Sequence, residues 1–134
     1  MILVDANIMM YAAGAEHPNK TPSVSFLEHV ATKQVDAAID AERLQEILHC
    51  DRSIRRWDDG KIVFDMTRQI FEAVIPISAE VVDRARVLLE SYPGLMARDA
   101  LHAAVAEINA MRSICSFDQD FGRISGMRRL EPPL

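Results

Sequence analysis

Residues 1–12 read MILVDANIMMYA and begin with a short apolar run, residues 1–5, that ends in the carboxylate of Asp5. Three later runs also consist of a few apolar residues bounded by polar ones: residues 35–39 (VDAAI), 74–77 (VIPI) and 113–117 (SICSF). Strands that are buried on both faces of a sheet have this composition. A fifth, weaker strand is expected around residues 128–130. Pro76 places the third strand at a sheet edge, because proline cannot donate a hydrogen bond to a neighbouring strand.

Amphipathic helices are expected between these strands, at residues 23–31, 41–56, 60–73, 79–92 and 100–111. Ser78 and Asp40 stand where they can cap the helices that follow them, and residues 17–22 (HPNKTP) read as a loop. Strands that alternate with helices predict an α/β fold, with a mostly parallel sheet covered by helices on both faces. The functional site of such a sheet lies at the carboxyl ends of its strands.

The composition is that of a globular domain, because 49% of the 134 residues are hydrophobic and 26% are charged. This length suits one domain, so we expect residues 1–134 to form a single one. No stretch of about 18 apolar residues could span a membrane, and the first residues lack the basic segment of a signal peptide. Cys50 and Cys115 form no zinc motif, and both are expected to be buried thiols in a reducing compartment. We therefore expect a cytoplasmic protein with no membrane partner.

Four acidic residues that lie far apart in the sequence are expected to meet at one edge of the sheet: Asp5, Glu46, Asp99 and Asp118. Carboxylates that gather without partners repel one another, and a hard divalent cation such as Mg²⁺ or Mn²⁺ removes that cost. Such an ion could bind a phosphodiester and activate water. The net charge of −5 argues against binding of duplex nucleic acid by charge alone. It does not exclude a nucleic-acid enzyme, since acids around a metal ion do not count as surface charge.

Each acid also has a structural interpretation that involves no catalysis. Asp5 could be a loop or capping residue, and Glu46 could lie on the solvated face of its helix. Asp99 could cap the helix that follows it. Asp118 could cap the short segment that follows the fourth strand, and either Asp118 or its neighbour Asp120 could do no more than form a turn. The joint placement of the four acids is the stronger signal, because four independent structural roles would all have to fall at one sheet edge.

Four segments of the sequence resemble the PIN-domain family, and they span residues 1–121 in the family's order. Residues 1–12 resemble the family's first strand, which ends in an Asp followed two residues later by Asn, Ser or Thr. The segments AERLQEILH (41–49) and ARDALHAAVA (97–106) resemble those that bear the second and third acids. The last segment, SICSFDQDF (113–121), resembles a strand followed by Thr/Ser-x-Asp-x-x-Phe. The chain is most similar to the VapC-type toxins within the family.

The resemblance implies a three-layer α/β/α fold with a five-stranded sheet of order 3-2-1-4-5. It implies a Mg²⁺- or Mn²⁺-dependent endoribonuclease that cleaves single-stranded RNA, that is inhibited by a cognate antitoxin and that commonly forms a homodimer. By matching position, Asp5, Glu46, Asp99 and Asp118 would be the catalytic acids, with Asp5, Asp99 and Asp118 as metal ligands. Asn7 and Ser116 would orient these acids, and Asp120 would be an additional ligand or a supporting group. The family often has Thr or Ser where this chain has Asp40.

Several other residues have two interpretations. His102 lies one turn after Asp99 and could support the site, although packing or hydrogen bonding within its helix is favoured. Arg98 could bind substrate phosphate or pair with an acid. The basic residues Arg52, Arg55 and Arg56, with Trp57 next to them, could bind RNA phosphates and a base. The favoured interpretation is that the arginines form a solvated face and that Trp57 belongs to a core or an interface.

Three other functions compete with the nuclease. A PIN-like fold could bind a protein partner without cleaving RNA, and intact acids argue against this. An aspartyl-phosphate phosphatase with Asp5 as nucleophile usually has a second acid two residues later, where this chain has Asn7. A nucleotide-binding domain would need a glycine-rich phosphate loop, and the sequence has five glycines in no such motif.

Overall fold

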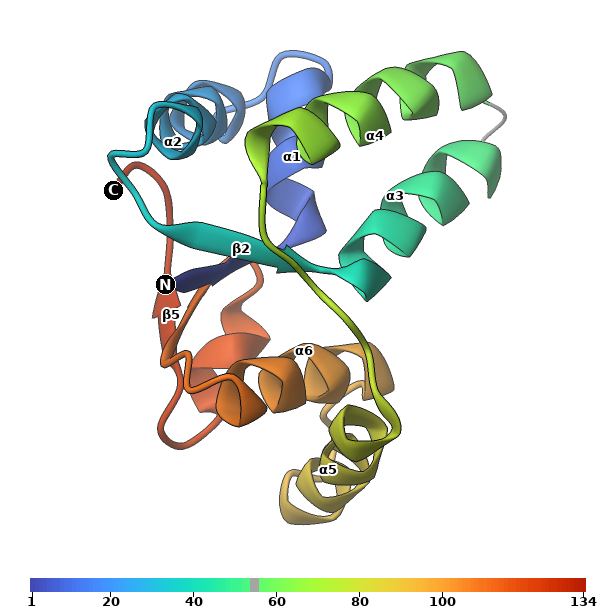
Figure 1. Ribbon diagram of the computed structural model, residues 1–134, viewed down its shortest axis with the longest axis vertical. Helices are drawn as coiled ribbons and strands as arrows, with labels where there is room; N and C mark the ends of the chain where they lie inside the picture. The colour runs from blue at the N-terminus through green and yellow to red at the C-terminus, as the bar shows by residue number, and fades with distance from the viewer. Residues whose placement is uncertain (54–55) are drawn as a thin grey trace.

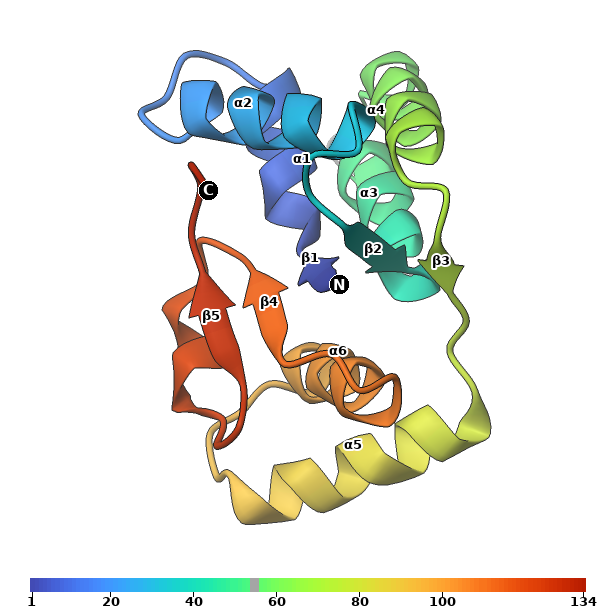
Figure 2. The same ribbon diagram turned by 60° about the vertical axis from the view of Figure 1, so that its left-hand side comes forward.

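The sheet has the predicted strand order. The computed structural model describes residues 1–53 and 56–134, and the side chains of these residues apart from 50–53. Within these ranges the five strands are β1 (Ile2–Val4), β2 (Ala37–Asp40), β3 (Val74–Ile75), β4 (Ser113–Cys115) and β5 (Arg128–Leu130). They are all parallel and lie in the order β3-β2-β1-β4-β5, as Figure 2 shows. Strand β3 lies at an edge, as the sequence predicts, but it ends at Ile75 and does not extend to residue 77.

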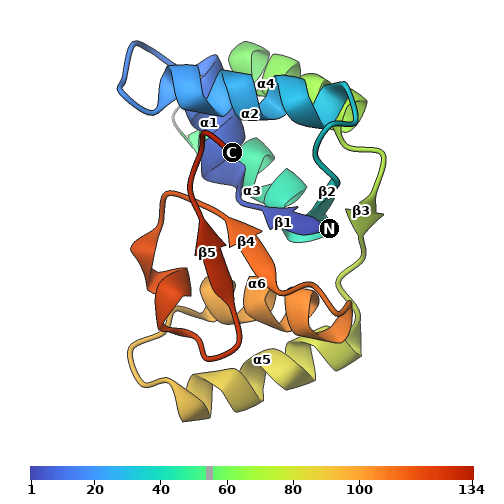
Figure 3. The same ribbon diagram turned by 90° about the vertical axis from the view of Figure 1, so that its left-hand side faces the viewer.

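Helices cover both faces of the sheet, which gives the expected three layers (Figures 1 and 3). One face carries α1 (Ala6–Ala13), α2 (Lys20–Ala31), α3 (Ala41–Ser53) and α4 (Trp57–Ile70). The other carries α5 (Ala79–Ser91), α6 (Ala97–Ile108) and the short helix η1 (Gln119–Arg123). No helix within the described ranges is long and apolar enough to cross a membrane.

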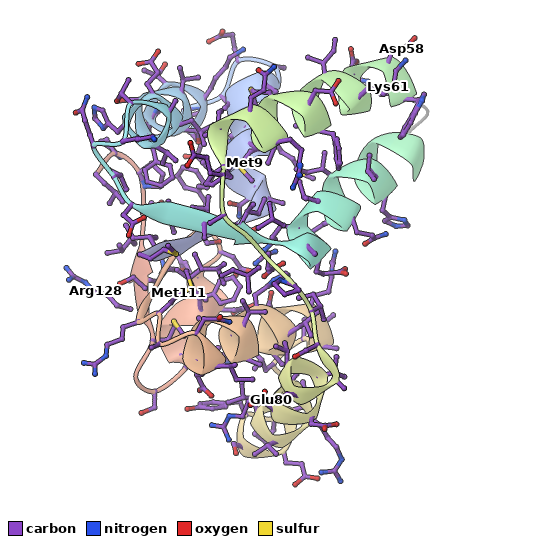
Figure 4. The ribbon with its side chains drawn as sticks, viewed as in Figure 1. Met9, Asp58, Lys61, Glu80, Met111 and Arg128 are labelled. Atoms are coloured by element: carbon purple, nitrogen blue, oxygen red, sulfur yellow. The ribbon has the colours of Figure 1, made fainter. Side chains whose placement is uncertain are left out.

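Alternate strand residues fill two separate cores, because successive side chains of a strand point to opposite faces. Leu3 packs against the core beneath α5 and α6, and Val4 packs against the core beneath α1 to α4. The same division separates Met111 from Met9, which lie on opposite sides of the sheet in Figure 4. Cys115 is buried, and desolvation raises the pKa of its thiol to about 12, so it remains protonated, as predicted for a buried thiol. Cys50 lies outside the side chains that the structure describes.

Several helices differ from the predicted ones in their presence or in their bounds. Helix α1 was not predicted, and Asp5 caps it by accepting a hydrogen bond from the backbone of Asn7. Helix α2 begins inside the predicted loop, with Pro22 in its first turn, where proline is tolerated. Helix α6 begins one turn earlier than predicted. Its N-cap is Met96, whose side chain makes no capping hydrogen bond. Helix α4 begins at residue 57 and ends before Phe71, which leaves the helix in extended conformation and is buried in the core.

We predict that Ala110→Gly stabilises the protein. Ala110 follows the C-cap of α6 with a φ of 56°, a left-handed conformation that costs residues other than glycine about 1–2 kcal/mol. Its side chain is exposed, so its removal costs little packing. After the entropy cost of glycine in the unfolded chain, the net gain should be about 0.5 kcal/mol, or about 2 °C in the melting temperature Tm. A Tm unchanged or lowered in a thermal scan would contradict this.

Candidate functional site

The carboxyl ends of β1 and β4 bring three of the predicted residues together. Asp5 follows β1, and its backbone N–H donates to the carbonyl of Cys115 at the end of β4. The hydroxyl of Ser116 donates to Oδ2 of Asp5 at 2.5 Å, and Nδ2 of Asn7 donates to that same hydroxyl oxygen at 3.3 Å. The Asp5 carboxylate is thus fixed by Ser116 and by the backbone N–H of Asn7.

Three further acids form a cluster beside these strand ends. Carboxylate oxygens of Asp99, Asp118 and Asp120 all lie within 4.8 Å of one another. Asp118 is held by its neighbours, because its N–H donates to Ser116 and its carboxylate accepts from the N–H of Asp120. Asp99 lies in the first turn of α6, and its alternative role as N-cap is wrong because Met96 occupies that position.

The pKa of the Asp99 carboxyl is raised from its ordinary value. The first cause is desolvation, and the charges of Asp118 and Asp5 add to it, while Arg43 and His102 act in the opposite direction. The pKa of Asp99 is therefore influenced by two other acids of the predicted set. A divalent cation bound beside Asp99 would offset both the desolvation of its carboxylate and the repulsion from Asp118 and Asp5.

Arg43 pairs with two of the predicted acids, Asp5 and Glu46. Its Nη1 atom lies 3.0 Å from Oδ1 of Asp5 and 3.0 Å from Oε2 of Glu46. The second oxygen of Glu46 accepts a hydrogen bond from the more exposed Arg98 at 3.0 Å, so Arg98 takes the acid-pairing alternative. The acids are therefore of two kinds. Asp5 and Glu46 pair with Arg43, and Asp120 pairs with Arg123 at 3.3 Å, whereas Asp99 and Asp118 have no arginine partner among the described residues.

A buried pair of polar residues connects β2 to α6 below the site. Nδ1 of His102 and Oδ2 of Asp40 lie 2.5 Å apart, and both side chains are inaccessible to solvent. The other oxygen of Asp40 accepts from the backbone N–H of Arg43, which confirms the predicted capping of α3. His102 is therefore buried, as its packing interpretation predicts, but its hydrogen bond runs to another element and not within its own helix. It orients α6, on which Asp99 lies.

The remaining basic and aromatic candidates lie elsewhere. Arg56 and Trp57 are exposed at the start of α4, where Asp58 and Lys61 also lie (Figure 4). Arg52 and Arg55 lie outside the side chains that the structure describes. Arg43 is a residue of the site that was not predicted. It lies three residues from both Asp40, which caps α3, and Glu46, a spacing that places the three on one side of the helix.

The fold and the site together define a three-layer α/β/α protein with acidic residues gathered at the carboxyl edge of a parallel sheet. The PIN domain family model matches residues 2–127, and the chain belongs to this family. It is 40% identical over 130 residues to ribonuclease VapC13 of Mycobacterium tuberculosis, covering 97% of this chain and 99% of the relative.

Solved structures show the same fold. The VapBC2 structure from Rickettsia felis, bound to a promoter DNA fragment, matches with a TM-score of 0.76 at 24% identity, covering 99% of this chain and 100% of the other. VapC20 of Mycobacterium tuberculosis, described as a sarcin-ricin loop cleaving toxin, matches with a TM-score of 0.75 at 15% identity, covering 92% and 94%.

Proposed function

We propose that this chain is a divalent-metal-dependent endoribonuclease that cleaves single-stranded RNA and acts as the toxin of a VapBC-type toxin–antitoxin module. Membership of the PIN domain family and the identity to a protein named a ribonuclease support the assignment as a hydrolase of phosphodiester bonds. The observation that carries the chemistry is the cluster of carboxylate oxygens of Asp99, Asp118 and Asp120 next to Asp5.

The residues present fit a bound Mg²⁺ or Mn²⁺ ion. Carboxylate oxygens are the ligands that these hard cations prefer. Burial is the main cause of the raised pKa of Asp99, and the nearby charges of Asp118 and Asp5 add to it. We assign Asp5, Asp99 and Asp118 as ligands, with Asp120 as an additional or supporting group. When bound, a divalent cation supplies Lewis-acid catalysis: it polarises a phosphoryl oxygen and makes water more acidic.

The protein's own residues would prepare this site and bind the substrate. Ser116 and Asn7 keep Asp5 in a single orientation through the hydrogen bonds described above. Glu46 holds Arg98, whose side chain is 60% exposed, so its remaining N–H groups can reach a phosphate of the RNA. We thus assign Glu46 a role in catalysis through the placement of Arg98.

Three aromatic rings support a single-stranded substrate. The Tyr11 ring lies 4.6 Å from that of His17 and 5.2 Å from that of Phe117, and Phe117 directly precedes Asp118. Unpaired bases can stack on such rings, whereas bases within a duplex cannot. His17 is exposed at the outer end of this group, and a base could stack on its free side.

His17→Ala should raise the KM for single-stranded RNA about fivefold and leave kcat unchanged. This is the lower limit of the effect of removing one stacking partner, about 1 kcal/mol. His17→Phe keeps a ring at this position and should retain most of the wild-type KM. Steady-state kinetics on a single-stranded oligonucleotide measure both variants, and an unchanged KM for His17→Ala would exclude base stacking here.

The proposed partners follow from the relatives. A structure described as a toxin–antitoxin complex from Klebsiella pneumoniae matches this chain with a TM-score of 0.66. We propose a cognate antitoxin as the protein partner of this chain, a homodimer as its assembly and the cytoplasm, where RNA is available, as its location.

A second candidate is a PIN-fold protein that binds its partner but does not cleave RNA. The ion pair between Arg43 and Asp5 favours it, because it neutralises an acid that the nuclease needs. Removal of the metal distinguishes the nuclease from the binding protein. With Mn²⁺ the nuclease should cut a single-stranded RNA, and excess EDTA should reduce the rate to background. No cleavage of any RNA with either metal, together with retained antitoxin binding, would favour the binding protein.

A further inference from the structure

Arg43 is a buried cation inside the acidic site. Its side chain is only 4% exposed, which is rare for an arginine unless it is paired. A single nitrogen, Nη1, contacts both Asp5 and Glu46 at 3.0 Å. This nitrogen therefore lies between two carboxylates from different elements, in the kind of position that a bridging metal ion takes.

We infer that Arg43 takes the place of a second metal ion, so that this site binds one divalent cation, on the side of Asp99 and Asp118, and not two. The inference rests on the proposed function, since it concerns the same site. A two-ion site needs one carboxylate that bridges the ions and further ligands for each of them. In this chain Asp5 could bridge two ions and Glu46 could be a further ligand of the second ion. Arg43 contacts both of these carboxylates.

The arginine cannot easily give way to a second ion. Displacement from Asp5 and Glu46 would leave a buried guanidinium without its carboxylate partners, which is strongly unfavourable. Its Nε and Nη2 atoms are buried and have no hydrogen-bond partner within the described part of the chain. The guanidinium carbon lies 5.8 Å from the centre of the Phe121 ring, a distance at which the ring attracts a cation. If the arginine stayed, its charge would repel a second cation.

The first ion can still use Asp5. An ionised carboxylate has about four lone-pair sites. On Asp5, Oδ1 accepts from the N–H of Asn7 and faces Arg43, and Oδ2 accepts from Ser116. One lone pair of Oδ2 therefore remains for a cation that Asp99 and Asp118 also bind.

Counting bound Mn²⁺ tests this inference without any measurement of RNA cleavage. Isothermal titration calorimetry and the EPR signal of free Mn²⁺ both give the number of ions per chain. The wild-type protein should bind one Mn²⁺ ion. Arg43→Gln removes the charge and should bind two. The double variant Arg43→Gln/Glu46→Gln lacks a ligand of the second position and should bind one again.

Two controls keep the result interpretable. Arg128→Gln removes an exposed arginine at the start of β5, far from α3 (Figure 4), and should still bind one ion. Glu46→Gln in the presence of Arg43 should also bind one, because Glu46 is not a ligand of the first ion. If Arg43→Gln does not fold by circular dichroism, the inference can still be overturned by two ions in the wild type or by none in Glu46→Gln.

Two ions in the wild type, or a folded Arg43→Gln that binds only one, would overturn the inference and leave the proposed nuclease intact. A Glu46→Gln variant that binds no ion would also overturn it. A wild-type protein that binds no ion would instead overturn the proposed metal site itself, and the inference with it.

Discussion

The Asp99→Asn variant should cleave single-stranded RNA about 10³-fold more slowly than the wild type, with no loss of stability in EDTA. A metal ion contributes several kcal/mol of transition-state stabilisation, and each 1.36 kcal/mol is a factor of ten in rate. Asparagine has the same shape as aspartate but cannot supply the charge. Single-turnover cleavage in Mn²⁺ and a thermal scan in EDTA measure the two effects.

The direction of the stability change follows from the raised pKa of Asp99. The first turn of α6 favours a negative charge, but the raised pKa shows that the environment as a whole disfavours it. Because the folded state holds the Asp99 proton more tightly than the unfolded state, metal-free stability declines as pH rises from about 3.9 through the raised pKa. This component should be absent from Asp99→Asn, whose Tm at pH 7 should be equal to or above that of the wild type.

Asp65→Asn is the matched control, because Asp65 is an exposed acid on α4. It should retain the wild-type rate. A wild-type rate in Asp99→Asn would exclude Asp99 from the chemistry, and a clear fall in its Tm in EDTA would contradict the electrostatic argument.

Asp5→Asn should also abolish cleavage, but with a large loss of stability, about 3 kcal/mol of unfolding free energy or about 10 °C in Tm. The expected loss of stability differs between Asp5→Asn and Asp99→Asn because Asp5 has an arginine partner and Asp99 has none among the described residues. Asp5 is 8% exposed and contacts the buried Arg43, so neutralisation of Asp5 leaves the guanidinium with Glu46 as its only carboxylate partner within the described ranges. Removal of one member of a buried ion pair costs several kcal/mol.

Urea denaturation in EDTA measures the loss, with Asp36→Asn as the control. Asp36 is 75% exposed and pairs with the N-terminal amine at 3.8 Å, so its replacement should change stability by less than about 0.5 kcal/mol. Equal stability of Asp5→Asn and Asp99→Asn in EDTA would show that the contact between Arg43 and Asp5 is absent in solution.

The sheet was predictable from the sequence because apolar runs buried on both faces are a local signal. Residues 113–117 and the short run before Asp5 both showed this signal. Helix α1 was missed because it begins directly after Asp5, which marks the end of the strand run, and its eight residues are too few for a clear periodicity. The first turn of α6 was missed because Met96 gives no capping signal.

The site was predictable as a set of positions but not as a set of contacts. Parallel strands end at one edge, so Asp5 and Asp118 had to lie near each other. Whether an acid has a partner depends on side chains from other elements, and a single sequence does not show these. Nothing in the sequence around Arg43 indicates a partner in another element, and only the fold shows that its guanidinium lies between Asp5 and Glu46.

The central claim is that the acids gathered by folding bind a divalent cation. Anomalous X-ray scattering from crystals soaked in Mn²⁺ tests it most directly. The claim predicts one strong peak about 2.2 Å from carboxylate oxygens of Asp99 and Asp118. Absence of a peak at these residues under saturating Mn²⁺, or a peak only at other surface acids, would contradict it.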